Sequence, residues 1–181
     1  MNEVLKYKIA LVAFMMDYLS KESIIRWTEI KIKELENPDI ILYDLVLCNN
    51  TNDLISLLNQ ASNDTVWDSS LTFDLEAIFM GHFNFLIKSK IDPIEIGKGI
   101  LSFYDCSNLP IDDDKKLFLS ILGVDLSLRN DGYKGTMDIP EELQNYTKEF
   151  ESRFLVLCDS ITKLDMELFS WLKFLNPKHQ F

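Results

Sequence analysis

The sequence predicts an all-α fold: a single-domain helical bundle of about seven or eight helices over residues 1–181, with a long C-terminal helical segment. Three observations favour this fold. The 181 residues include only six glycines and five prolines, fewer than a turn-rich β-sandwich or barrel usually carries. Residues that cap helices recur along the chain, and two of them, Asn37 and Asp92, directly precede a proline at an expected helix start. Apolar residues near the C-terminus repeat at intervals of three and four.

The first two helices are predicted at residues 3–19 and 20–35. Ile9 to Met16 form a continuous apolar run, far shorter than the roughly 20 residues that span a bilayer. Asp17 follows at once and no small-residue cleavage site is present, so the run predicts a buried helix rather than a signal peptide. Ser20 is the expected N-cap of the second helix.

The third and fourth helices are predicted from their first residues. Asn37 can cap a helix and Pro38 fits its first turn, so a helix is expected to include residues 40–47. This run is also apolar enough for a buried strand, but it has no hairpin partner. Thr51 is expected to cap the short fourth helix.

The middle of the chain continues the helical pattern. A Phe-rich helix is expected at residues 71–88, and Asp92–Pro93 repeats the cap-and-proline signal for a helix that ends near Tyr104. A further helix is expected from Asp112 or Asp113 to Gly123. The glycine-containing stretch at 130–136 predicts a loop.

The last predicted segment opens with acidic residues around Pro140 and then carries a regular apolar series. Its members are Leu143, Tyr146, Phe150, Phe154, Leu157, Ile161, Leu164, Leu168, Trp171 and Leu175. An unbroken helix here would be roughly 50 Å long, whereas a compact chain of this size has a radius of gyration of about 16 Å. We expect the helix to break within 159–165 and to cross the core. The alternative is a homodimer through the Leu143–Leu175 stripe.

The number and spacing of the cysteines indicate the cellular compartment of the protein. Cys48, Cys106 and Cys158 are widely spaced and form no CxxC pair, which excludes a zinc knuckle and a thioredoxin-type redox motif. Reduced thiols packed as small apolar groups are typical of a cytoplasmic protein. We therefore expect a cytoplasmic protein that does not insert into a membrane.

Candidate catalytic residues are few. His82 lies in the Phe-rich segment, where a histidine is more often a packed or interface residue than a general base. Asp105 with Cys106 could provide a nucleophile, but the sequence shows no base to activate it. The run Asp112–Asp114 lacks the spacing of a calcium loop, and no HExxH, GxSxG or phosphate-loop motif occurs. We expect a non-enzymatic protein with no cofactor and no metal site. An enzyme that uses His82 and nearby carboxylates is the least favoured alternative.

Charge is the most informative feature. The chain has 18 Lys and Arg against 29 Asp and Glu, a formal net charge of −11, which argues against a reader of nucleic acid. No Lys or Arg occurs between Lys33 and Lys88, whereas nine acidic residues do. Carboxylates without local cations create a field of one sign, which accelerates association with a basic protein. The stretch from Glu34 to Glu76 is therefore the predicted partner-binding region, unless cations from the C-terminal half compensate it.

Six residues of this region are the predicted contacts: Asp53, Asp64, Trp67, Asp68, Asp74 and Glu76. Trp67 lies between two acidic residues in a polar stretch, and a large aromatic side chain in that setting suits an anchor against a cationic partner. A lid that packs back onto the core is the alternative for this tryptophan.

Residues 20–60, under a quarter of the chain, are similar to small bacterial proteins of polymorphic-toxin loci. The shared features are a Trp-bearing helix, an Asn-Pro start, a D-L-x-L turn and an N-D-L-x-x-L-L helix, here Trp27, Asn37, Pro38, Asp44, Leu45, Leu47, Asn52, Asp53, Leu54, Leu57 and Leu58. The resemblance implies an immunity protein that inhibits a toxin in the cytosol through a tight stoichiometric complex. Many such toxins are basic nucleases, which suits the acidic stretch. A helical homo-oligomer with a structural or regulatory role is the alternative.

Overall fold

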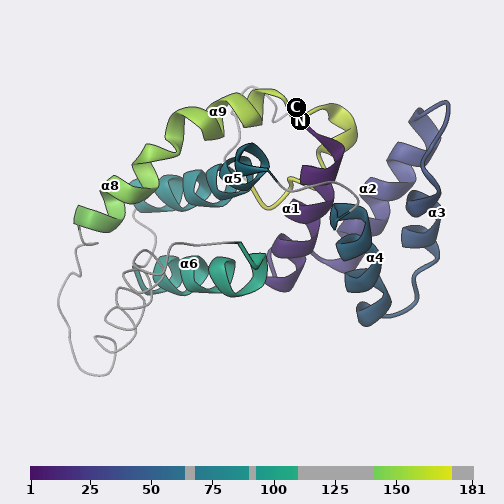
Figure 1. Cartoon of the computed structure of the whole chain (residues 1–181), viewed down its shortest axis with the longest axis horizontal. Helices are drawn as coiled ribbons and strands as arrows, with labels where there is room; N and C mark the ends of the chain where they lie inside the picture. Colours follow the sequence, from purple (N-terminus) through teal and green to yellow (C-terminus); the bar gives the residue numbers. More distant parts are fainter. Residues whose placement is uncertain (64–67, 90–92, 110–140, 173–181) are drawn as a thin grey trace. The chain divides into compact units, whose positions relative to one another are not determined.

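The computed structural model describes residues 1–63, 68–89, 93–109 and 141–172. Within these ranges the regular secondary structure is entirely helical, so the predicted all-α fold is confirmed (Figure 1). The chain divides into two compact units. The first unit comprises the described residues of 1–71 and 157–181, and the second comprises those of 72–156. That the chain is one domain stays a prediction.

The first unit contains α1 (Glu3–Met15), α2 (Lys21–Glu34), α3 (Ile40–Leu47), α4 (Thr51–Asn63) and the short 3-10 helix η2 (Lys163–Asp165). Helix α1 packs against α4, α2 packs against α3 and η2, and α3 packs against α4. Figure 1 shows α4 beside α1 and α3 beside α2. The buried residues of α1 run without interruption from Leu5 to Ala13, which confirms the expected buried first helix.

The turn between α1 and α2 follows the capping chemistry. Helix α1 ends at Met15, earlier than expected, and Asp17 takes a left-handed backbone conformation with φ 59°. Aspartate tolerates this conformation better than most residues do. Ser20 caps α2 as predicted, because its hydroxyl oxygen accepts a hydrogen bond from the backbone N–H of Ser23 at 3.2 Å.

The predicted cap of α3 is wrong by two residues. Asp39, and not Asn37, is the N-cap, since its carboxylate accepts a hydrogen bond from the backbone N–H of Ile41 at 3.3 Å. Pro38 therefore precedes the helix instead of lying in its first turn. Residues 40–47 nevertheless form a helix and not a strand, as expected.

A buried carboxylate connects distant parts of the first unit. Asp165 of η2 is fully buried, and it accepts hydrogen bonds from the indole N–H of Trp27 at 3.3 Å and from the hydroxyl of Thr162 at 2.8 Å. The oxygen that accepts the bond from Thr162 also lies 2.9 Å from the ammonium of Lys6. A buried charge is tolerated only when it is paired and hydrogen-bonded, so these contacts position η2 against α1 and α2.

Glu3 extends this network at the start of α1. Its carboxylate lies 2.6 Å from the ammonium of Lys6 and also pairs with Lys31 of α2. The Lys31 ammonium lies 5.0 Å from the ring centroid of Trp27, within the range of a cation–π contact. The two lysines are buried, and each thus has a carboxylate partner.

The ion pairs shift the pKa values of the network. Burial alone would raise the pKa of Asp165, but the hydrogen bonds from Lys6 and Thr162 outweigh it and the pKa lies below the usual value of 3.8. Burial alone would lower the pKa of Lys6, but the bonds to Glu3 and Asp165 outweigh it and the pKa lies above 10.5. Folding therefore favours the charged form of both groups.

Replacing Asp165→Asn should lower the free energy of unfolding at neutral pH by about 3 kcal/mol, because Lys6 loses a buried charge partner. The lowered carboxylate pKa means that the stability of the wild type falls as pH drops below 3.8, and the variant should lose this part of the acid dependence. Urea titrations at a series of pH values measure both effects. Glu29→Gln, at an exposed position of α2, is the control. Equal unfolding free energies for Asp165→Asn and the wild type would contradict the role of the network.

The second unit contains the part of α5 (Ser69–Lys88) from residue 72 on, α6 (Pro93–Ser107), α8 (Glu141–Glu149) and the first residues of α9 (Glu151–Asp159). Aromatic side chains form much of its interior. The rings of the fully buried Phe79 and Phe103 lie 4.7 Å apart, and the ring of the buried Phe150 lies 5.4 Å from that of Phe73, which is 45% exposed. The Phe-rich segment thus forms a helix, as predicted, and much of this helix is buried.

The C-terminal apolar series does not form one helix. Helix α9 ends at Asp159 and is followed by a turn and η2, which confirms the predicted break within 159–165. A further interruption at Phe150 was not predicted. Several members of the series are buried within the chain: Leu143, Phe150, Phe154, Leu157, Leu168 and Trp171. A homodimer through this stripe would require them to leave the interior.

Gly81 lies at a close contact between two helices of the second unit. A Cβ atom added to this residue of α5 would overlap the side chain of Phe154 on α9. Only the absence of a side chain permits this approach of the two helices.

Gly81→Ala should therefore destabilise the protein by about 2 kcal/mol, since the overlap outweighs the gain of about 1 kcal/mol in helix propensity. The double variant with Phe154→Ala should lose less stability than the sum of the two single variants, because the smaller side chain makes room for the new Cβ. Chemical denaturation of the four proteins measures this coupling. Additive losses would contradict the contact.

Several predicted features lie outside the described residues. They are the Asp92 cap, the helix from Asp112 or Asp113 to Gly123, the loop at 130–136 and the residues up to Pro140. Among the residues that are described, no helix has the length and hydropathy needed to cross a membrane.

Candidate interaction surface

Asp74, a predicted contact residue, is engaged inside the second unit. It is buried, and its two carboxylate oxygens accept hydrogen bonds from Arg153, from Nε at 2.6 Å and from Nη2 at 2.8 Å. The hydrogen bonding to Asp74 raises the pKa of the Arg153 guanidinium. The expectation that Asp74 belongs to an uncompensated acidic face is therefore wrong: a cation from the C-terminal half neutralises it.

Glu76 also has a hydrogen-bond partner within the second unit. It is half-buried and accepts a hydrogen bond from the hydroxyl of Tyr104 at 3.3 Å. The Tyr104 hydroxyl lies 2.5 Å from that of Tyr146, and burial together with this neighbour raises the pKa of Tyr104. Glu76 therefore forms part of an internal polar group and is a poor candidate for the primary contact with a partner.

The predicted contacts Asp64, Trp67 and Asp68 have different outcomes. Asp68 is exposed, and its carboxylate accepts a hydrogen bond from the backbone N–H of Leu71 at 2.8 Å, so it stabilises the start of α5. Asp64 and Trp67 lie outside the described residues, and their role as contacts stays a prediction.

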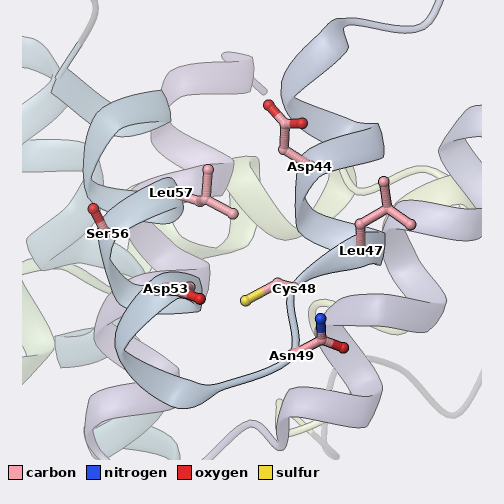
Figure 2. Close-up of a pocket in the computed structure, with 7 residues that line it drawn as sticks. All are labelled: Asp44, Leu47, Cys48, Asn49, Asp53, Ser56 and Leu57. Carbon is pink, nitrogen blue, oxygen red and sulfur yellow. The ribbon is translucent and has the colours of Figure 1, made fainter.

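Asp53 lines a recess of about 370 Å³ between α3 and α4 (Figure 2). The lining residues are Asp44, Leu47, Cys48, Asn49, Asp53, Ser56 and Leu57. Helix α3 and α4 each contribute one carboxylate and one leucine. Figure 2 shows Leu57 extending from α4 toward α3, and the Cys48 side chain lying between the two helices. The recess thus combines apolar walls with two acidic groups.

The start of α4 holds the Asp53 carboxylate in place. Asn50, rather than the predicted Thr51, caps this helix: its side-chain oxygen accepts a hydrogen bond from the backbone N–H of Asp53 at 2.9 Å. The Asn50 side-chain N–H in turn donates to the Asp53 carboxylate at 2.5 Å. The thiol of Cys48 donates to the backbone carbonyl of Asn50 at 3.1 Å. These reciprocal bonds resemble a capping box and limit the motion of the carboxylate.

Exposed carboxylates gather on this part of the first unit. Five of them are exposed and lie between the end of α2 and the start of α4: Glu34, Glu36, Asp39, Asp44 and Asp53. None forms an ion pair with a cation in the described ranges of the chain. We call these five residues the α3–α4 acidic surface. Their field is screened over about 8 Å at physiological ionic strength.

Asp44 was not among the predicted contact residues, although the sequence contained a signal for it. It is the single charged residue within the apolar run of α3, and a charged side chain in such a helix must face water. Its helical position, one turn before Leu47, brings it to the same recess as Asp53.

The candidate catalytic groups do not assemble into a site in the described ranges. His82 is buried, and burial lowers its pKa to about 4, far from the value that suits a general base at neutral pH. Burial, with the charge of Asp159, raises the pKa of the Cys158 thiol to about 12, so a reactive thiolate is disfavoured. Among the described residues no group of three His, Cys, Asp or Glu side chains is placed to hold a metal ion.

The second recess of the first unit, about 390 Å³ in volume, lies over the buried ionic network. Glu3, Lys6, Lys31 and Asp165 all line it. The charges of these four residues are paired with one another, and the remaining charged lining residue, Asp39, belongs to the α3–α4 acidic surface. The α3–α4 acidic surface is therefore the better candidate for a function.

No protein-family model, curated protein or solved structure matches the chain. The similarity of residues 20–60 to immunity proteins consequently stays a prediction.

The burial of His82 has a measurable consequence. Because its folded-state pKa of about 4 lies below the ordinary 6.5, the unfolded chain takes up the proton first as pH falls. The free energy of unfolding should decrease by up to about 3 kcal/mol between pH 6.5 and 4. His82→Gln should remove this part of the pH dependence. NMR titration, with His179→Gln to assign the signals, should show that the His82 ring does not protonate near pH 6.5.

Proposed function

We propose that the chain is a non-enzymatic cytoplasmic binding protein that neutralises a basic protein, of the toxin-domain class, through the α3–α4 acidic surface. One observation carries the proposal: Asp44 and Asp53 are exposed on two helices around one recess, with no ion-pair partner in the described ranges. Asp74 offers the contrast, since its charge is neutralised within the chain.

The recess suits a lysine or arginine side chain of the partner. The apolar stem of such a side chain would pack between Leu47 and Leu57, and its charged end would reach the carboxylates of Asp44 and Asp53. Charge-assisted hydrogen bonds to carboxylates are roughly twice as strong as neutral ones. The bonds between Asn50 and Asp53 reduce the entropy lost on binding, because one carboxylate is already held in position.

The surface also supports a kinetic role. Exposed charges of one sign raise the rate of association with an oppositely charged protein and disfavour acidic proteins. Rapid capture matters for a protein that must inhibit a toxin before the toxin acts. The similarity of residues 20–60 to proteins of polymorphic-toxin loci supports the same class of partner.

Binding to the purified product of the adjacent gene tests this function. We expect a complex of defined stoichiometry whose association slows as ionic strength rises. Asp44→Lys should lower the association rate constant roughly tenfold and change the dissociation rate constant less. Stopped-flow fluorescence at several salt concentrations measures both constants.

Glu149→Lys is the matched control, since it makes the same charge change at an exposed position of α8. Its association rate should stay within about twofold of the wild type. Absence of binding at low salt would refute the proposed partner. Binding that is indifferent to salt and to Asp44→Lys would refute the role of the acidic surface.

A further inference from the structure

Helix α3 is apolar on both of its faces. Leu42 and Leu45 are buried, and α3 packs against α2 and α4. Three further large apolar side chains of the same helix are exposed: 76% of Ile40, 45% of Tyr43 and 72% of Leu47. Of the eight residues of α3, only Asp44 is charged. A helix at the surface of a globular unit usually carries polar residues on its outer side, so this composition requires a reason.

The three exposed side chains form one row. They are separated by three and four residues, which places them on one side of an α-helix along two turns. A spacing of i, i+3 and i+7 is the pattern by which a helix inserts apolar anchors into a complementary groove. The tyrosine adds a hydroxyl group, and tyrosine is among the residues enriched at energetically important interface positions.

Charge limits what can cover this row. Asp39 caps the helix beside Ile40, and Asp44 lies one residue after Tyr43. Both are exposed, as are Glu34 and Glu36 in the segment that leads to α3. Two copies of this chain docked through α3 would bring these carboxylates together, and like charges at an interface are unfavourable. A partner with an apolar surface bordered by Lys and Arg would match both the row and its border.

We infer that α3 is the ridge that inserts into an apolar groove of a cationic partner, with Ile40, Tyr43 and Leu47 as its anchors. The identity of the partner rests on the proposed function, whereas the chemistry of the partner is inferred from the residues of α3 themselves. The carboxylates of the α3–α4 acidic surface steer the approach, and the apolar row determines the lifetime of the complex. The affinity therefore depends more on Ile40 and Leu47 than on any single carboxylate.

The chemistry of the partner can be tested without the natural one. The probe is a display library of small folded domains with a randomised concave surface, selected on the wild-type protein and counter-selected on Ile40→Ser/Leu47→Ser. We expect the recovered domains to be enriched in both Lys or Arg and large apolar residues at the randomised positions. Their affinity for the double variant should be at least tenfold weaker. Recovery of no such domains, or of domains without cationic enrichment, would overturn the inference.

The product of the adjacent gene provides the second measurement. If it binds, Ile40→Ser/Leu47→Ser should raise the dissociation rate constant roughly 100-fold, about tenfold for each anchor, with a much smaller effect on association. Leu155→Ser, at an exposed leucine of α9, is the matched control and should change neither constant. Circular dichroism of each variant verifies that the helices are retained.

The outcomes separate the two proposals. Binding of the adjacent gene product that the double variant leaves unchanged would overturn the inference and keep the proposed function. Enrichment of cationic, apolar domains without binding of that product would refute the proposed partner and support the inference. Sedimentation equilibrium should show a monomer at a protein concentration of roughly 100 μM. A dimer that Ile40→Ser/Leu47→Ser dissociates would identify a second copy as the occupant and overturn the inference.

Discussion

The buried carboxylate of Asp165 ties the C-terminal part of the first unit to the two helices at its beginning. Its contacts with Lys6 and Trp27 reach α1 and α2, and α2 and α4 are the helices against which α3 packs. Separation of these elements would leave the Asp165 carboxylate either exposed to water or buried without a cation. Because an unpaired buried charge is costly, the elements stay together. The helices that carry the α3–α4 acidic surface are therefore held in position by an ionic network as well as by apolar packing.

The nine carboxylates between Lys33 and Lys88 illustrate how folding redistributes charge. Asp74 and Glu76 acquire partners from residues far along the chain, Arg153 and Tyr104. The carboxylates around α3 and α4 stay exposed without a cation from the described ranges. A stretch that looks uniform in sequence is thus divided between internal structure and a surface that is suited to a partner. This division favours a binding role that is narrower than the whole acidic stretch.

Helix α3 shows why the position of a residue matters more than its type. Leu45 and Leu47 are chemically alike and two residues apart, yet one is fully buried and the other is 72% exposed. The run is apolar enough for a buried strand, yet in the helix that it forms only Leu42 and Leu45 of the eight residues are buried. The exposed half has the features of an interface: apolar anchors at helical spacing, acidic neighbours and an adjoining recess. Burial of these anchors by a partner would remove the cost of their contact with water.

Local features of this protein were determined by the sequence itself. The all-α fold and the Ser20 cap follow from short-range chemistry, in which side chains compete for the backbone groups of their own neighbours. The break after Asp159 follows from the length of an unbroken helix, which exceeds the size of a compact chain. The caps of α3 and α4 lay one or two residues from their predicted places because several capping residues stand side by side there. Only the tertiary structure decided that Arg153 neutralises Asp74 and that Asp44 and Asp53 share a recess. These relations join residues through packing across helices, which periodicity and composition do not encode.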